Sequence, residues 1–353
     1  MNKRILIISP YDALSHRQWH EGIVREFPEL TFEVVTLPPR YFSWRHRGNS
    51  LSLAFDPTLA EPYDLVLATS MTDLSALKGM QPKLAGVPTV LYFHENQFAY
   101  PPGRSDQGAV ERQITSLYSA LAADHLVFNS AYNRDTFITG VQTLLARMPD
   151  HVPPGIVEKL SENAVVLPVP LDDNLFIMDA RKPAEGVSIV WNHRWEYDKG
   201  LSELHDIATS LLDTEIDFTL HLIGQQFREV PEMITTVMEL LRHHGRLGET
   251  GFIPSRAEYL SLLARSHVVL STALHEFQGL AVLEAVATGC SPVVPDRLVY
   301  PELFPSEFLY KTPDDAVALI GRLAKGVGSS ADVSPLAWNT QRPAWYELLI
   351  QST

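Results

Sequence analysis

Two carboxylates, Glu276 and Glu284, stand eight residues apart where an apolar run gives way to a helical pattern. Glu276 precedes the expected helix, and Glu284 lies inside it. At about 1.5 Å of rise per residue, the two are separated by roughly 7 to 8 Å along the axis, which is about the length of one diphosphate. One carboxylate can accept hydrogen bonds from the hydroxyls of a sugar, and the other from those of a ribose. The spacing suits a ligand that carries a sugar at each end of a diphosphate.

The start of the same helix offers a site for phosphate. The backbone N–H groups of Gln278, Gly279 and Leu280 come before any partner within the helix and lie at the positive end of its dipole. Glycine lets the backbone approach a ligand closely. The alternative is that Glu276 caps the helix and Glu284 is solvated. The spacing of the two carboxylates, taken alone, favours that alternative.

A basic pair, Arg194 and Lys199, follows an apolar run in what we expect to be a single strand-to-helix loop. A fixed guanidinium and a mobile ammonium suit a diphosphate leaving group, because negative charge develops there as its bond to the sugar breaks. The alternative is surface ion pairing with Glu196 and Asp198. Two aromatic residues in the same loop indicate partial burial and favour the phosphate site.

Four consecutive polar residues, His94, Glu95, Asn96 and Gln97, follow another apolar run in the first half of the chain. A lone histidine is more often structural than catalytic, but His94 stands at the end of a strand, where catalytic residues of α/β proteins gather. His16 occupies the equivalent position after the first strand. It is expected either to reach the ligand or to pack.

Arginine and aromatic residues alternate between positions 40 and 47. Arg40, Arg45 and Arg47 supply positive charge, and Trp44 is one of three aromatic rings among them. Stacking on bases and pairing with phosphates needs both residue types, so the segment is a candidate RNA-binding loop. The alternative is a cation–π surface loop without a ligand.

Apolar runs alternate with amphipathic stretches along the whole chain, and this alternation predicts α/β domains with parallel, doubly wound sheets. We expect an N-terminal domain over 1–172, a linker over 173–186, a second domain over 187–334, and a helix near 335–353 that packs back on the first. Ligands of such sheets bind at the carboxyl ends of the strands, so we expect the site between the two domains. The strands are expected at 4–9, 31–37, 64–68, 89–93, 125–129, 164–167, 188–191, 217–223, 247–252, 267–271 and 290–294.

Composition narrows the function classes. The chain has 353 residues and a net charge of −14, which argues against non-specific coating of nucleic acid, although residues 1–50 carry a net charge of +2. Cys290 is the sole cysteine, which excludes an intramolecular disulfide or multi-cysteine metal site and fits a reducing cytoplasm. Asp172-Asp173 and Asp314-Asp315 are interpreted as turn and cap residues, so no metal site is expected. No membrane span is indicated, and the sequence gives no oligomeric state.

The segments YFHENQ, NHRWEYDKG, STALHEFQGLAVLEA and LVYPELFP resemble the tRNA-queuosine α-mannosyltransferases, a branch of the family 4-like retaining glycosyltransferases. The resemblance covers nearly the whole chain. It implies the GT-B fold of two Rossmann-like domains, GDP-mannose as donor, and queuosine in a tRNA anticodon loop as acceptor. It also implies a metal-independent reaction without a cofactor.

Residue by residue, the resemblance implies that Glu276 and His94 meet the transferred sugar, Glu284 the ribose, and Arg194 with Lys199 the diphosphate. The remaining donor-binding positions are Phe277, Gln278, Gly279, Leu280, His16, Gly224, Phe252 and Ile253, the last three near the guanine. The acceptor-binding positions are Arg40, Trp44, Arg45, Arg47, Glu95, Asn96 and Gln97. Many GT-B relatives have a glycine pair in the first loop. This chain has none, so phosphate contact with that backbone is not expected.

Two other functions fit the same residues. The acceptor can instead be a lipid, glycan or small metabolite, in which case binding should depend little on salt. A non-catalytic nucleotide-sugar or RNA-binding module is the other hypothesis, and release of GDP from GDP-mannose would contradict it.

Overall fold

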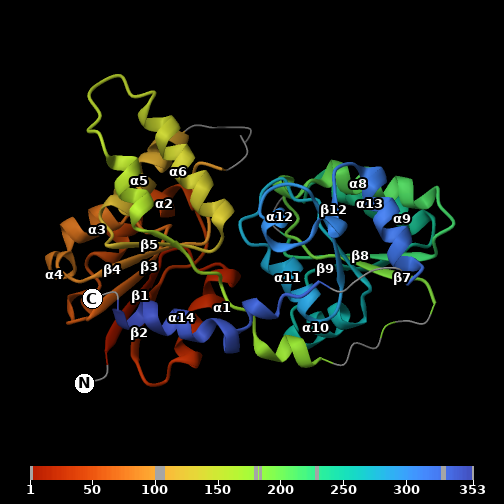
Figure 1. Cartoon of the computed structure of the whole chain (residues 1–353), viewed down its shortest axis with the longest axis horizontal. Coiled ribbons are helices and arrows are strands. Elements are labelled where there is room, and N and C mark those ends of the chain that lie inside the picture. The colour runs from red at the N-terminus through yellow and green to blue at the C-terminus, as the bar shows by residue number, and fades with distance from the viewer. Residues whose placement is uncertain are drawn as a thin grey trace. The chain divides into compact units, whose positions relative to one another are not determined.

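The computed structural model describes residues 3–99, 108–178, 182, 185–226, 230–326 and 331–351. It divides into two compact units, one of Met1–Pro170 with Trp338–Thr353 and the other of Leu171–Ala337 (Figure 1). Within the segment expected as a linker, Asp173–Ile177 form a short 3₁₀-helix, and residues 179–181, 183 and 184 lie outside the described residues.

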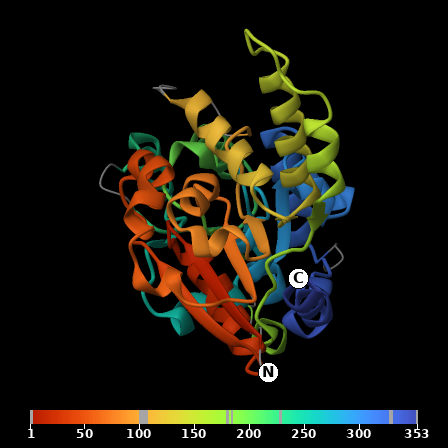
Figure 2. The ribbon, with the colours of Figure 1, turned by 90° about the vertical axis from the view of Figure 1, so that its left-hand side faces the viewer.

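The first unit is built on a parallel six-stranded sheet in the order β2-β1-β3-β4-β5-β6. Figure 2 shows its first strands, in red and orange, side by side. The strands are β1 (Arg4–Ser9), β2 (Thr31–Thr36), β3 (Leu65–Thr69), β4 (Thr89–Phe93), β5 (His125–Phe128) and β6 (Ala164–Val166). The helices are α1 (Leu14–Glu26), α2 (Phe42–Leu53), α3 (Leu74–Met80), α4 (Pro82–Ala85), α5 (Ala109–Leu121), α6 (Ala131–Leu145), α7 (Ile156–Glu162) and α14 (Trp338–Gln351), with a 3₁₀-helix at Pro57–Ala60.

Helices cover both faces of this sheet because every central strand is apolar on both sides. Leu6 and Ile8 of β1 pack in one core with residues from α2, α3, α5 and α6. On the opposite face, α14 lies beside α1 (Figure 1), and the Trp345 ring packs 6.2 Å from the ring of Trp19. The C-terminal helix is therefore part of the first unit's core.

The second unit repeats this architecture with the strand order β12-β11-β10-β7-β8-β9. Its strands are β7 (Val187–Trp191), β8 (Phe218–Ile223), β9 (Leu247–Gly251), β10 (Val268–Leu270), β11 (Ser291–Pro295) and β12 (Leu309–Tyr310). Its helices are α8 (Leu201–Leu212), α9 (Glu232–His243), α10 (Arg256–Arg265), α11 (Leu280–Ala287), α12 (Tyr300–Leu303) and α13 (Pro313–Ala324), with 3₁₀-helices at Tyr197–Lys199, Ser306–Phe308 and Ser334–Leu336.

The strand order determines where a ligand can enter. In the second sheet, β7 lies between β8 and β10, so the chain winds in one direction after β7 and in the other after β10. Loops that leave neighbouring strands in opposite directions open a crevice at the carboxyl ends of the strands. The crevice of the second unit is therefore formed by the loops that follow β7 and β10.

The predicted fold class is confirmed. Each expected strand matches an observed strand, and its two ends differ from the observed ends by at most one residue. Strand β12 was not predicted. The expected loop at 40–47 was wrong, because α2 begins at Phe42. Polar and small residues such as His46, Asn49 and Ser50 form the buried side of α2, so no apolar stripe marks it in the sequence.

Two of the paired aspartates have the turn and cap roles expected for them. Asp172 caps the 3₁₀-helix that follows it, and Asp315 forms a capping box with Thr312, as the turn and cap interpretation requires. Cys290 is buried, and burial raises the pKa of its thiol to about 12. Among the described residues, no helix has the length and apolar character to cross a bilayer.

Candidate functional site

Lys199 lies buried in the crevice of the second unit, between the loops that follow β7 and β10. Its ammonium nitrogen Nζ donates to the carbonyl oxygen of His275 at 2.8 Å. It also lies 3.3 Å from Oδ2 of Asp198 and 3.4 Å from Oε2 of Glu276. The structure thus brings together Lys199 and Glu276, which the sequence analysis assigned to one site.

The backbones of the two loops are joined directly beside this ion cluster. Gly200 has a φ of 66°, and a Cβ there would lie 1.9 Å from the carbonyl oxygen of Thr272. The backbone N–H of Leu274 donates to the carbonyl oxygen of Asp198 at 2.9 Å. These contacts need a residue without a side chain at position 200, and they hold Lys199 opposite the second loop.

Arg194 forms the surface ion pairs that the sequence analysis had disfavoured. Its guanidinium lies 2.8 Å from the Glu196 carboxylate and 3.7 Å from that of Asp198, and its side chain is 47% exposed. With Glu276, three carboxylates therefore face the two cations. The expected cationic pocket is instead an ion network with one more carboxylate than cations, because Glu196 and Asp198 of the same loop and Glu276 pair with Arg194 and Lys199.

Burial and charge set the protonation of this network. Burial alone would raise the pKa of Asp198, but the His275 ring, whose Nδ1 lies 3.8 Å from Oδ2, and the charges of Lys199 and Arg194 hold it well below its usual value. The pKa of Glu196 is raised, chiefly by burial, although Arg194 opposes the change. Asp198 is thus a permanent anion between the two cations.

Glu276 is bonded to the backbone of the turn before α11 and does not cap the helix itself, which begins after Gly279 without a side-chain cap. Its carboxylate accepts the backbone N–H of Phe277 at 3.2 Å. Burial alone would raise its pKa, but Lys199, two neighbouring histidines and a hydrogen bond from the Gly279 backbone lower it. The same carboxylate therefore caps the turn before α11 and faces Lys199.

The other donor-binding positions of this segment surround the start of α11. Gly279 directly precedes the helix, Phe277 and Gln278 are buried, and Leu280 is half-buried. The Phe277 ring packs against His275, with 4.7 Å between ring centroids. Phe277 thus contributes packing, and its neighbours contribute backbone at the helix start.

The alternative interpretation of Glu284 as a solvated residue was wrong. Its two carboxylate oxygens accept hydrogen bonds from the guanidinium of Arg256, and Tyr259 donates to Oε2 at 3.3 Å. Arg256 and Tyr259 lie on α10, whose first residues carry no pattern that marks them as functional. Sequence reasoning therefore missed both residues.

The positions assigned to the guanine follow β8 and β9. The backbone of Gly224 packs so closely that a Cβ would lie 1.8 Å from the carbonyl oxygen of His193. Its N–H donates to the carbonyl oxygen of Gly251 at 3.0 Å. Phe252 is exposed and Ile253 half-buried at the end of β9. The close packing of the backbone thus explains the glycine at position 224 without a ligand. Phe252 presents an exposed ring.

In the first unit, the structure brings His16 and His94 side by side. Their ring centroids are 4.1 Å apart, and Nε2 of His16 lies 3.9 Å from Oε2 of Glu95. The ring of Trp19 contacts His94 edge-on at 4.8 Å. Burial lowers the pKa values of His16 and His94, so both rings are neutral near pH 7. A neutral imidazole can donate a hydrogen bond to a hydroxyl or accept one from it.

Asn96 holds the loop that follows β4 together. It donates to the side-chain oxygens of Asn133 and Thr136, both at 2.9 Å, and accepts the backbone N–H of Phe98 at 2.9 Å. Asn96 is therefore a structural residue of this loop, because its buried amide is satisfied there, and the structure does not support the acceptor-binding role expected for it. Gln97 is half-buried beside it.

The arginine and aromatic residues near position 40 lie at the start of α2. Tyr41 and Trp44 are 72% and 55% exposed. The guanidinium of Arg40 stacks over the Tyr41 ring at 5.7 Å. Arg47 pairs with Asp73 at 2.8 Å, and Arg45 is half-buried. Arg40, Tyr41 and Trp44 form an exposed basic and aromatic surface, which we call the α2 patch.

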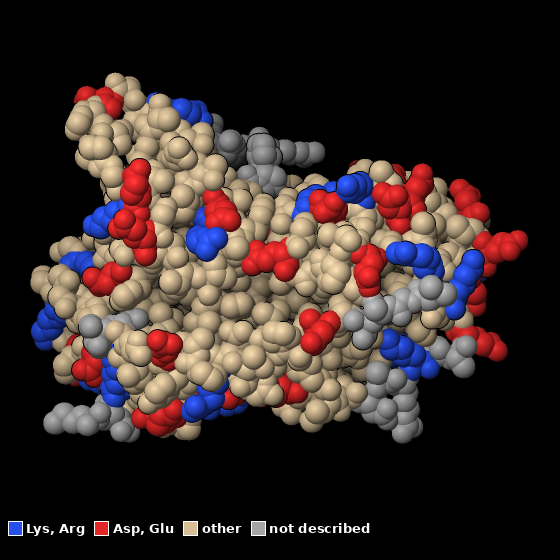
Figure 3. Space-filling model, viewed as in Figure 1, with Lys and Arg blue, Asp and Glu red and all other residues tan. Residues whose placement is uncertain are grey.

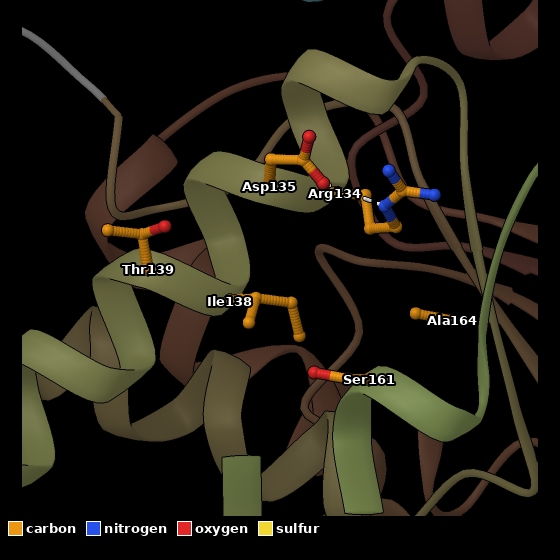
Figure 4. Close-up of a pocket in the computed structure, with 6 residues that line it drawn as sticks. All are labelled: Arg134, Asp135, Ile138, Thr139, Ser161 and Ala164. Atoms are coloured by element: carbon orange, nitrogen blue, oxygen red, sulfur yellow. Dashed lines mark hydrogen bonds and ion pairs between the residues drawn. The ribbon is translucent and has the colours of Figure 1, made fainter. Parts of the chain in front are cut away.

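The first unit also has a hollow on its surface. A shallow hollow of about 370 Å³ between α6 and the end of α7 is lined by Arg134, Asp135, Ile138, Thr139, Ser161 and Ala164 (Figure 4). Arg134 and Asp135 pair with each other there at 2.8 Å. Acidic and basic side chains are interspersed on the face shown in Figure 3. No group of three or more potential metal ligands occurs among the residues that the structure describes.

Comparisons with known proteins agree with this fold and sequence. Residues 4–171 match the family model of the tRNA-queuosine α-mannosyltransferase N-terminal region. A tRNA-queuosine α-mannosyltransferase of Drosophila melanogaster is 34% identical over 317 residues, which cover 87% of this chain and 83% of the relative.

Solved structures show the fold. Sucrose-phosphate synthase from Thermosynechococcus elongatus matches with a TM-score of 0.71 and 15% identity, covering 100% of both chains. The lipopolysaccharide outer core galactosyltransferase WaaB matches with a TM-score of 0.66 and 11% identity, covering 99% of this chain and 100% of that one. The expected GT-B fold is confirmed. Together with the sequence relationship, this shows that the chain belongs to the tRNA-queuosine α-mannosyltransferase family.

Proposed function

We propose that this protein transfers mannose from GDP-mannose to queuosine in tRNA, with retention of anomeric configuration. The family relationship supports the sugar and the acceptor. The observation that carries the chemistry is the crevice of the second unit. There, Lys199, Glu276 and the start of α11 meet at the point where the strand order reverses.

The donor occupies this crevice in our proposal. Arg194 and Lys199 bind the diphosphate, the start of α11 at Gly279 adds backbone N–H groups, and Glu284 accepts from the ribose. When the diphosphate binds, it replaces Glu196 as the ion-pair partner of the half-exposed Arg194. The buried Lys199 keeps its contacts with the neighbouring carboxylates. These cations supply the positive charge that the leaving group needs, so we propose a metal-independent reaction.

The reaction breaks the bond between the anomeric carbon of mannose and the diphosphate oxygen. The electron pair of that bond goes to GDP, whose developing charge Arg194 and Lys199 stabilise. An acceptor hydroxyl attacks the anomeric carbon from the same face, and its proton passes to the leaving phosphate oxygen. Glu276 positions the sugar. No protein nucleophile takes part.

The acceptor side is assigned to the first unit. The α2 patch offers a guanidinium and two exposed rings, which suit the phosphates and unstacked bases of an RNA loop. A lipid or neutral glycan would leave this combination without a role. The α2 patch therefore favours RNA over the other acceptors.

The test is incubation of the purified protein with single nucleotide sugars and queuosine-containing tRNA, followed by mass analysis of the digested nucleosides. We expect one hexose added to queuosine from GDP-mannose alone, with activity unchanged by a metal chelator. tRNA that lacks queuosine and the Arg194→Ala variant serve as controls. Addition from another donor, or to a lipid or glycan instead of tRNA, would overturn the assignment.

A further inference from the structure

Arg256 holds the carboxylate of Glu284 through both of its oxygens. Its NH1 group donates to Oε2 of Glu284 at 3.0 Å, and its NH2 group donates to Oε1. Such a forked contact fixes the plane and rotation of the carboxylate, which a lysine in the same place could not do. The side chain of Glu284 is 14% exposed, so this contact leaves it little freedom.

Tyr259 links the carboxylate to the rest of the crevice. Its hydroxyl donates to Oε2 of Glu284 at 3.3 Å and accepts from Asn192 Nδ2 at 3.1 Å. Asn192 also donates to the carbonyl oxygen of Ala281 at 2.7 Å. Burial raises the pKa of Tyr259, so its hydroxyl keeps the donated proton. The loop after β7, helix α10 and helix α11 thus meet at one carboxylate.

The count of acceptor positions limits what else Glu284 can bind. A carboxylate has about four lone-pair positions. Arg256 fills two of them and Tyr259 a third. In this arrangement Glu284 has room for one more donor.

We propose that Arg256 is a positioning residue that fixes Glu284 so that it accepts a hydrogen bond from one ribose hydroxyl of the nucleotide, not from both. The inference rests on the proposed function, in which Glu284 meets the ribose. Arg256 acts through Glu284 and touches neither the diphosphate nor the reacting carbon.

The chain provides a matched control on the same helix. Arg265 pairs with Glu249, and its side chain is 43% exposed, compared with 44% for Arg256. Its partner is 49% exposed, so this pair lies in solvent. An Arg265→Ala variant removes a similar charge from α10 without reaching Glu284.

The experiment measures binding of GDP and of 2′,3′-dideoxy-GDP by calorimetry. We expect Arg256→Ala to weaken GDP binding about tenfold or more, as for a lost hydrogen bond to a charged group, and to leave dideoxy-GDP binding unchanged. Arg256→Lys should fall between wild type and alanine, and Arg265→Ala should match wild type. With Glu284→Ala in place, adding Arg256→Ala should have no further effect. Of 2′-deoxy-GDP and 3′-deoxy-GDP, only one should bind as weakly as the dideoxy compound.

The outcomes separate the inference from the proposed function. Equal GDP binding by wild type and Arg256→Ala, or an equal loss on dideoxy-GDP, would overturn the role of Arg256. A similar loss with each single deoxy compound would overturn the count of one hydroxyl. If wild type binds GDP no better than dideoxy-GDP, the ribose role of Glu284 fails, and this inference fails with it. If the alanine variant does not fold, the binding test uses Arg256→Lys, and thermal unfolding checks that this variant is folded.

Discussion

The ammonium nitrogen of Lys199 lies 3.4 Å from Oε2 of Glu276, although the two residues are 77 positions apart in the chain. One comes from the loop after β7 and the other from the loop after β10, so the contact depends on the strand order of the second sheet. The same carboxylate also caps the turn before α11. A ligand that binds Lys199 therefore meets an anchored carboxylate beside it.

Arg194 and Lys199 should respond differently to removal. Arg194→Ala should lower turnover by about 10²-fold or more and cost about 1 kcal/mol of stability or less, because its ion pairs are half-exposed. Lys199→Met should also destabilise the fold by about 3–5 kcal/mol, because it leaves Asp198 and Glu276 without their buried cation. Steady-state kinetics and denaturant unfolding measure the two effects. Arg246→Ala, which removes a pair with Asp217 elsewhere in the unit, should retain turnover.

Glu196→Gln should tighten binding of GDP. Glu196 competes with the diphosphate for the Arg194 guanidinium, which it contacts at 2.8 Å, and its removal also makes the crevice more positive by one charge. We expect the dissociation constant from calorimetry to fall several-fold at low salt and to approach wild type as salt rises. Weaker binding would show that Glu196 positions Arg194 instead of competing for it.

Gly200→Ala should cost more stability than Gly245→Ala. Both glycines have nearly the same φ, 66° and 67°, so each alanine pays roughly 1–2 kcal/mol for the left-handed backbone. The Cβ at position 245 meets nothing within 4 Å, whereas the one at position 200 lies 1.9 Å from the Thr272 carbonyl oxygen. We expect a further cost of about 1–3 kcal/mol at Gly200 and a raised KM for the donor. Equal costs in denaturant unfolding would contradict the close approach of the two loops.

His193 should make stability fall on acidification. Burial lowers its pKa from 6.5 to about 3, so below pH 6.5 the unfolded chain binds a proton that the folded protein does not. Stability should therefore decrease by about 1.4 kcal/mol per pH unit between pH 6 and 4 from this residue and level off below about pH 3. Denaturant unfolding of His193→Gln across this range should show a slope smaller by that amount. An unchanged slope would mean that His193 is not buried in its neutral form.

The α2 patch should bind tRNA through both stacking and charge. Trp44→Ala should weaken binding by about 1–3 kcal/mol, the contribution of one stacked base. Arg40→Ala should reduce the salt slope of binding by about 0.7–0.9. Phe55, just beyond α2, is 82% exposed, and Phe55→Ala serves as the control for an aromatic residue outside the patch. Filter binding across a salt series tests both, and a loss with Phe55→Ala equal to that with Trp44→Ala would contradict the patch.

The strands could be predicted from sequence because parallel sheets bury both faces, so each strand is a nearly continuous apolar run. β12 has only two residues, too few to form such a run. Helix α2 was not predicted from the sequence, for a different reason. Its buried side is held by the Asn49 amide, which donates to the carbonyl oxygens of Arg45 and Met71. Such hydrogen bonding leaves no period in hydrophobicity.

The loops of the site could also be predicted, but the partners within them could not. The spacing of Arg194, Lys199 and Glu276 marked the loops after β7 and β10. Whether Arg194 pairs with Glu196 depends on side-chain geometry that no spacing encodes. Arg256 comes from α10 and reaches Glu284 only through the packing of two helices.

The second unit begins at Leu171 and ends at Ala337, and these two residues pair side by side in a parallel bridge. Helix α14 follows and places Trp345, which is fully buried, in the core of the first unit. On the ribosome, the face of the first sheet that α1 and α14 share therefore stays only partly covered until the entire second unit has been translated. The inserted unit can complete its own core earlier, so the half of the protein that is made first finishes folding last.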